Sequence, residues 1–179
     1  MRLSKSKNLF LVGPMAVGKT TIGKLLAREL GLQFIDSDQE IEKKAGAEIT
    51  WIFDVEGENK FRDRESSVID ELTQREGILL ATGGGSVLRK SNRIHLQSRG
   101  IVVFLDTSLE TQIKRTEKDK KRPLLQNVDH RKVLSELKDI RGPMYSEVAD
   151  FKVFVGDSNS RKTVATILHH LKDDDLVQD

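Results

Sequence analysis

Leu9-Phe-Leu-Val-Gly-Pro-Met-Ala-Val-Gly-Lys-Thr20 joins a short apolar run to the pattern Gly-x-x-x-x-Gly-Lys-Thr, the signature of a P-loop. In such a loop, backbone N–H groups surround a polyphosphate and the N-terminus of the next helix faces the same anion. Apolar residues then follow at helical spacing, and a glycine stands at the C-cap position: Ile22, Leu25, Leu26, Leu30 and Gly31. The pattern therefore predicts a strand, a loop and a helix that bind a nucleoside triphosphate.

Two side chains of this loop have defined tasks in a P-loop. Lys19 is expected to reach the β- and γ-phosphates, and Thr20 to offer its hydroxyl to Mg²⁺. The alternative is a glycine-rich turn that binds nothing. We assign nucleotide binding to the whole loop and the start of the helix: Gly13, Pro14, Met15, Ala16, Val17, Gly18, Lys19, Thr20 and Thr21.

Length and composition limit the class of protein. A chain of 179 residues with 37% hydrophobic and 32% charged residues is typical of one globular domain, residues 1–179. The net charge of +2 favours neither a nucleic acid nor a membrane partner, and the lack of cysteine excludes disulfides and thiolate metal sites. No signal peptide pattern and no apolar run near the roughly 20 residues of a membrane span is found. We expect a cytoplasmic, monomeric enzyme.

Five short apolar runs alternate with helical patterns along the chain. They comprise residues 8–12, 33–35, 78–81, 101–105 and 151–155. Such runs are typical of parallel strands buried on both faces, and the intervening lengths suit crossover helices. The sequence therefore predicts an α/β fold, a three-layer sandwich with five parallel strands and helices on both faces. The tail, residues 172–179, is expected to fray.

Two aspartates, Asp36 and Asp38, follow the second predicted strand. Ligands of open parallel sheets lie beyond the carboxyl ends of the strands, so both carboxylates are expected near the γ-phosphate. One would hold a Mg²⁺-bound water, and the other would orient or deprotonate an acceptor hydroxyl. The alternative is that Ser37 or Asp38 only caps a helix beginning near Gln39.

Arg62 and Glu65 lie three residues apart in a predicted helix, so they can meet on one face. An arginine held by a carboxylate is suited to bind an acidic substrate, because its planar fork matches a carboxylate. The alternative is an ordinary surface pair of little energetic value. The buried face of this helix is predicted to contain Phe61, Val68, Ile69 and Leu72.

Three later features are also candidates. The run Thr82-Gly-Gly-Gly85 follows a strand and lets backbone approach a ligand closely, unless it is only a flexible turn. Arg122 suits a lid arginine that neutralises a transferring phosphoryl group, or else a solvated loop charge. Arg141 precedes Gly142 and Pro143, where we expect the helix to kink or stop and so expose the arginine to a pocket.

Taken together, these features resemble the shikimate kinase family from about Asn8 to Ala149. The resemblance includes the P-loop, Asp36-Ser-Asp38, Gly57-Glu58, Phe61-Arg62, Glu65, Thr82-Gly-Gly-Gly85, Arg122-Pro-Leu-Leu125 and Arg141-x-Pro-x-Tyr145. It implies a nucleoside-monophosphate-kinase-like fold with strand order 2-3-1-4-5. It also implies transfer of the ATP γ-phosphoryl group to the 3-hydroxyl of shikimate, with Mg²⁺, in the chorismate pathway.

The resemblance further implies how shikimate is bound. Asp38 would hold the acceptor hydroxyls, while Arg62 and Arg141 would clamp the carboxylate. The backbone of the glycine run would contact the same ligand, through Gly83, Gly84 and Gly85. The resemblance also implies a substrate-binding region at about 37–65, which contains Asp38 and Arg62.

For the nucleotide, the resemblance implies that Lys19 and Arg122 neutralise the γ-phosphate, with Arg122 in a lid at about 115–127. Thr20 and Asp36 would organise Mg²⁺. Arg115 and Ser158 would lie near the adenine. The loop departs from the family at Ala16-Val17, where Gly-Ala is commoner. Ala16 therefore stands at a position that often uses the conformational freedom of glycine, and the sequence does not fix the exact backbone path there.

Other functions remain as alternatives. A different small-molecule kinase, acting on gluconate or a nucleoside monophosphate, would need another pocket where the paired arginines suggest a carboxylate. A GTP-dependent switch protein is disfavoured because no Asn-Lys-x-Asp motif follows a late strand. An inactive nucleotide-binding module is disfavoured because every expected catalytic position is filled.

Overall fold

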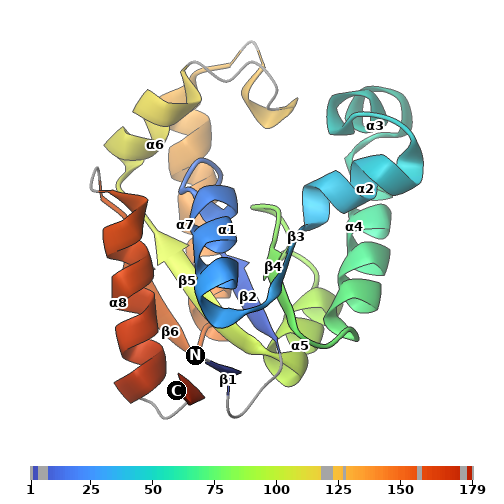
Figure 1. Cartoon of the computed structure of the whole chain (residues 1–179). Helices are drawn as coiled ribbons and strands as arrows, with labels where there is room; N and C mark the ends of the chain where they lie inside the picture. The colour runs from blue at the N-terminus through green and yellow to red at the C-terminus, as the bar shows by residue number, and fades with distance from the viewer. Residues whose placement is uncertain are drawn as a thin grey trace.

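A computed structural model describes residues 2–3, 8–117, 123–126, 128–156, 159–173 and 177–178 (Figure 1). Its centre is a five-stranded sheet in the order β3-β4-β2-β5-β6, and every pairing in it is parallel. Counted along the chain, this is the predicted order 2-3-1-4-5. The strands are β2 (Leu9–Val12), β3 (Gln33–Asp36), β4 (Ile78–Ala81), β5 (Ile101–Asp106) and β6 (Phe151–Phe154), each within one residue of its predicted ends.

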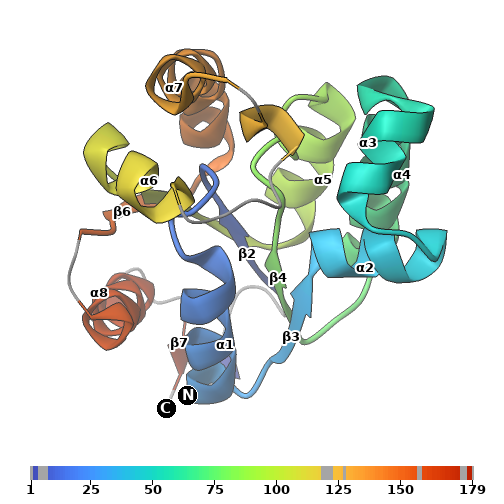
Figure 2. The ribbon, with the colours of Figure 1, turned by 90° about the horizontal axis from the view of Figure 1, so that it is seen from above.

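Helices cover both faces of this sheet, as predicted (Figure 2). The first face carries α1 (Lys19–Leu30) and α8 (Ser160–Asp173). The second face carries α4 (Glu58–Thr73), α5 (Lys90–Arg99) and α7 (His130–Val148). Around the carboxyl ends of the strands lie α2 (Ser37–Ala45), α3 (Ile49–Glu56), α6 (Leu109–Thr116) and the short 3₁₀ helix η1 (Pro123–Leu125).

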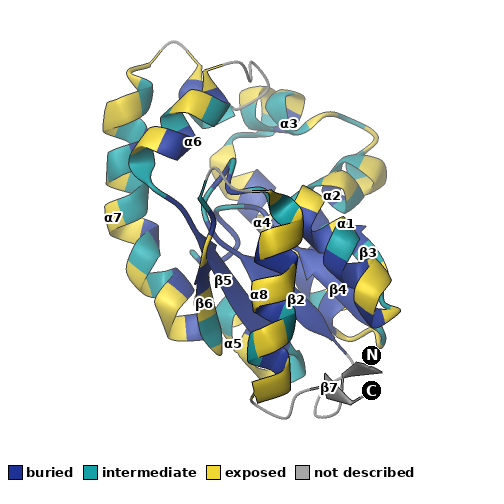
Figure 3. Cartoon of the chain, turned by 60° about the vertical axis from the view of Figure 1, so that its left-hand side comes forward, coloured by how far each residue is buried: buried dark blue, intermediate teal, exposed yellow. Residues whose placement is uncertain are grey.

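Strand β2 shows why the sheet is apolar throughout. Leu9 and Leu11 pack toward α1 and α8, while Phe10 and Val12 pack toward the opposite layer. All four residues are buried because helices exclude water from both faces (Figure 3). Close packing of α1 also depends on Gly23, since a Cβ there would come within 2.7 Å of the Phe34 ring.

The structure corrects two expectations. Helix α7 does not stop at Pro143 but continues to Val148. Proline removes one helix hydrogen bond, yet Tyr145 and Val148 beyond it are buried in the core, and this packing stabilises the last turns. Two residues of the tail are not frayed either, because β7 (Val177–Gln178) pairs antiparallel with β1 (Arg2–Leu3), whereas residues 174–176 and 179 lie outside the described residues.

Candidate active site

Two adjoining cavities open beyond the carboxyl ends of the strands. The first has a volume of about 320 Å³ and is lined by Met15, Ala16, Gly18, Lys19, Thr20, Thr21, Asp36, Asp38, Thr82, Gly83, Gly84 and Arg115. The second, of about 70 Å³, is lined by Met15, Asp38, Ile49, Phe53, Phe61, Arg62, Glu65, Gly83, Gly84, Gly85, Pro123, Leu124 and Arg141. Four residues line both cavities: Met15, Asp38, Gly83 and Gly84. The predicted P-loop and the predicted arginine clamp therefore belong to one continuous site.

Three residues of the P-loop, Gly13, Ala16 and Gly18, have positive φ angles. Gly13 has φ +144°, and a Cβ there would overlap the carbonyl oxygen of Leu105, so only glycine fits. Ala16 is the one described non-glycine residue with a positive φ, at 61°. The ammonium of Lys19 donates to the carbonyl oxygens of Gly13 at 2.6 Å and Pro14 at 2.8 Å. These bonds hold its charge beside the first cavity.

Thr20 and Asp36 come together at the same cavity. The hydroxyl of Thr20 donates to Oδ2 of Asp36 at 2.8 Å. The other oxygen, Oδ1, accepts from the backbone N–H groups of Asp38 at 3.0 Å and Gln39 at 3.4 Å. Asp36 is therefore the N-cap of α2, so the alternative of a cap at Ser37 or Asp38 before a helix starting near Gln39 is wrong.

The hydroxyl oxygen of Thr20 and the carboxylate of Asp36 are suitable ligands for Mg²⁺. This ion usually takes only one or two protein carboxylates and completes its octahedron with phosphate oxygens and water. The residues present suit a metal that arrives with a nucleotide.

Two of the glycines after β4 leave space for charged side chains. A Cβ on Gly83 would come within 2.7 Å of Oδ1 of Asp38, and a Cβ on Gly85 within 2.5 Å of Cζ of Arg62. The run is also held in place, because Gly83 N–H donates to the Ser37 hydroxyl and the Tyr145 hydroxyl donates to the Gly84 carbonyl. It is therefore a fixed wall of the site and not a loose turn.

Arg62 and Glu65 form a buried ion pair, not the surface pair considered as an alternative. Their side chains meet at 2.9 Å, and the residues are 8% and 1% exposed. Burial raises the pKa of Glu65, an effect that the positive charge of Arg62 opposes. A second bond at 3.1 Å joins Arg62 to the more exposed Glu58. The pair therefore fixes the guanidinium against the glycine run.

Arg141 lines the same cavity from α7. It is 5% exposed, and burial lowers its pKa, with the nearby charge of Arg62 acting in the same direction. The carboxylate of Glu65 interacts with both guanidinium groups. A carboxylate ligand beside them would add a second negative charge that opposes their mutual repulsion.

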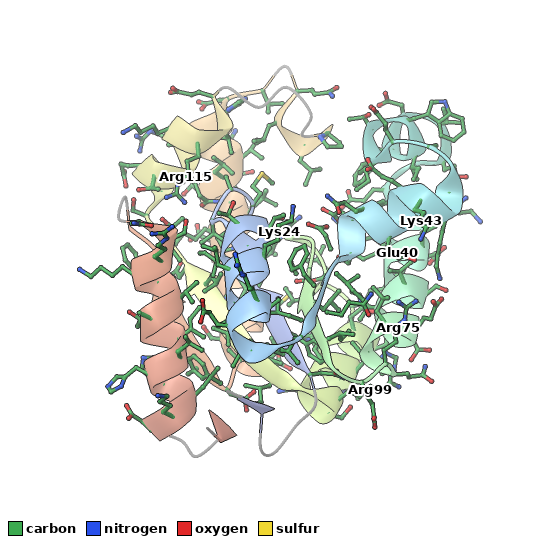
Figure 4. All side chains as sticks on the ribbon, viewed as in Figure 1. Lys24, Glu40, Lys43, Arg75, Arg99 and Arg115 are labelled. Carbon is green, nitrogen blue, oxygen red and sulfur yellow. The ribbon has the colours of Figure 1, made fainter. Side chains whose placement is uncertain are left out.

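Three nucleotide contacts are predicted outside the P-loop: Arg115, Arg122 and Ser158. Arg115 lies on α6 beside the P-loop (Figure 4), and its guanidinium donates to the carbonyls of Ala16 at 3.1 Å and Val17 at 3.2 Å. Arg122 and Ser158 lie outside the described residues. Sequence reasoning missed Tyr145 as a support of the glycine run, although its position four residues after Arg141 places both on one helix face.

With this geometry in place, comparison with known proteins identifies the family. A model of the family "Shikimate kinase" matches residues 15–172. The chain belongs to the shikimate kinase family. Shikimate kinases from Buchnera aphidicola (subsp. Schizaphis graminum) and Pasteurella multocida are each 55% identical to it, over 94% and 96% of this chain and 98% of theirs.

Solved structures agree with this assignment. The shikimate kinase from Acinetobacter baumannii in complex with shikimate has a TM-score of 0.93 and 47% identity, and the match covers 97% of both chains. The one from Aquifex aeolicus has a TM-score of 0.82 and 34% identity, covering 94% of this chain and 98% of the other. Family membership confirms an ATP- and Mg²⁺-dependent kinase of the predicted fold class, and the gluconate kinase alternative is not favoured.

Proposed function

We propose that this chain transfers the γ-phosphoryl group of ATP to the 3-hydroxyl of shikimate, giving ADP and shikimate 3-phosphate. The observation that carries the proposal is the shared wall of the two cavities. The P-loop cavity and the two-arginine cavity meet at Asp38, Gly83 and Gly84. A carboxylate bound by Arg62 and Arg141 would therefore leave the hydroxyls of the same small ring near Asp38, next to the phosphates.

The residues then have distinct tasks. Lys19 and the loop N–H groups bind the phosphates, and Lys19 neutralises charge on the transferring group. Asp38 orients the acceptor hydroxyl and accepts its proton. Thr20 and Asp36 hold Mg²⁺, which when bound neutralises charge on the phosphate oxygens. Positioning and charge neutralisation supply most of the catalysis, as in other phosphoryl transfers.

Several finer assignments belong to the same proposal. Residues 37–65 form the substrate-binding region and residues 115–127 the lid, within a single kinase domain 1–179. Arg122 completes the charge neutralisation from the lid, and Arg115 and Ser158 lie near the adenine. We also propose that the enzyme is monomeric and cytoplasmic. None of the described helices has the length and apolar character needed to cross a bilayer.

A coupled assay of ADP release tests the reaction, with shikimate, gluconate and AMP compared as acceptors in the presence of Mg²⁺ and ATP. Turnover with shikimate alone is expected, and a flat trace with shikimate would rule the proposal out. Asp38→Asn should abolish turnover while leaving the fold intact. Full activity in that variant would remove the catalytic role of Asp38.

The clamp is tested separately by Arg62→Ala. Truncating one partner of a buried, hydrogen-bonded charge contact costs about 2–5 kcal/mol, so shikimate should bind at least about 30-fold more weakly while ATP binding barely changes. Arg64→Ala is the matched control, because Arg64 lies on the same helix, is partly exposed, and pairs with Glu56 outside the site. Equal losses for both ligands in the Arg62 variant would contradict the clamp.

A further inference from the structure

Two side chains of helix α6 donate hydrogen bonds to backbone carbonyl oxygens of the P-loop. Gln112 is only 2% exposed, and its side-chain nitrogen donates to the carbonyl of Met15 at 3.0 Å. Arg115, one turn later on the same face, donates to the carbonyls of Ala16 and Val17. Three consecutive carbonyl groups of the loop thus bond to one helix. The orientation of the Gln112 amide is unambiguous, because a carbonyl oxygen only accepts.

Peptide planarity gives these bonds a consequence for the opposite side of the loop. In a trans peptide, the C=O of one residue and the N–H of the next point in opposite directions. When the carbonyls of Met15, Ala16 and Val17 face α6, the N–H groups of Ala16, Val17 and Gly18 face away from it. Met15, Ala16 and Gly18 line the first cavity, so α6 turns a row of donors toward the place of the phosphates.

The bonds also act on the least favourable backbone conformation of the loop. A left-handed residue other than glycine costs about 1–2 kcal/mol, and Ala16 has such a conformation at φ 61°. Strain of this kind persists only where the surroundings hold it. The two peptide units that flank Ala16 are those whose carbonyls bond to Gln112 and Arg115.

We propose that Gln112 is a positioning residue for the nucleotide: it fixes the peptide between Met15 and Ala16 so that the N–H of Ala16 points at the phosphates. The inference rests on the proposed function, since the ligand of the loop is there the polyphosphate of ATP. Gln112 touches neither substrate nor nucleotide in this account. It acts through the loop, and its effect should be confined to nucleotide binding.

The test uses Gln112→Met, which keeps the length of the side chain and removes the donor. Losing one buried hydrogen bond to the loop should weaken ADP binding about tenfold, measured by titration calorimetry. The affinity for shikimate should not change, and KM for ATP should rise while KM for shikimate does not. Lys114→Met is the matched control, because Lys114 is exposed on the same helix, and it should match the unsubstituted chain.

The outcomes separate this inference from the proposed function. If the unsubstituted chain binds no ADP, the proposed function fails. If the unsubstituted chain binds ADP and Gln112→Met binds it equally well, only the role of Gln112 fails. Equal losses for ADP and shikimate, together with a lower melting temperature, would show a general structural role and overturn the inference.

A shorter substitution covers the case in which Gln112→Met does not fold. Gln112→Asn keeps the amide but is one methylene too short to maintain the 3.0 Å bond to Met15. The same selective loss of ADP affinity is expected from it. Unchanged ADP affinity in a folded Gln112→Asn enzyme would overturn the inference as well.

Discussion

Replacing Gly85, which lines the second cavity, by alanine should displace the guanidinium of Arg62. The new Cβ would lie within 2.5 Å of Cζ and Nη2 of Arg62. Ordinary contact begins near 3.5 Å, so the guanidinium must retreat by about 1 Å. That shift breaks the 2.9 Å bond to Glu65 and takes the guanidinium out of the clamp. The guanidinium is the far end of a long side chain and Gly85 has no positive φ, so the backbone can keep its path and the chain should still fold.

The expected loss is large and confined to one ligand. A misplacement of about 1 Å can cost on the order of 100-fold, and losing the charge contact costs about 2–5 kcal/mol, so shikimate should bind 30-fold or more weakly. Titration calorimetry with shikimate and ADP measures both affinities, and ADP binding should stay unchanged. Gly142→Ala is the control, because a Cβ there meets nothing within 4 Å. An unchanged shikimate affinity in folded Gly85→Ala would refute the reasoning.

Three further substitutions give separate expectations. Thr20→Val keeps the side-chain shape but removes the hydroxyl. The Mg²⁺ concentration for half-maximal activity should therefore rise about tenfold, while ADP binding without metal stays constant. An unchanged Mg²⁺ requirement would contradict the metal site. Glu65→Gln removes a carboxyl whose pKa burial raises above 4.5, so the folded state binds that proton more tightly. The unfolding free energy of the unsubstituted chain, relative to this variant, should therefore fall as pH rises above 4.5 in urea titrations, and a rise would reverse the sign of the pKa shift. Tyr145→Phe loses the bond to Gly84 and should lower the unfolding free energy by about 1 kcal/mol, measured in the same way.

The sequence predicts the sheet well for a physical reason. A strand covered on both faces must be apolar throughout. In a chain with 32% charged residues, continuous apolar runs such as residues 78–81 and 101–105 therefore indicate buried strands. The P-loop can also be predicted from the sequence, because Gly13 and Gly18 have backbone conformations that other residues rarely adopt. Local chemistry fixes these elements, so they could be identified without an alignment.

Features that depend on distant contacts were harder to predict. Pro143 indicates a helix end by its local chemistry, but the burial of Tyr145 on the next turn keeps α7 helical. The cap of α2 is Asp36, whose other carboxylate oxygen accepts from Thr20, sixteen residues earlier in the sequence. Gln112 carried no sequence signal, because an uncharged residue in a short amphipathic helix gives no indication of the loop 97 residues away that it contacts.

The pairing of β1 with β7 brings the two ends of the described chain together, at the far end of the sheet from α2, α3 and α6 (Figure 1). A short linker between them would suit circular permutation, with new ends opened at an exposed turn elsewhere. For the same reason, a fluorescent protein or immobilisation tag attached at either end would lie far from the two cavities of the active site. Immobilised enzyme prepared in this way should retain substrate access.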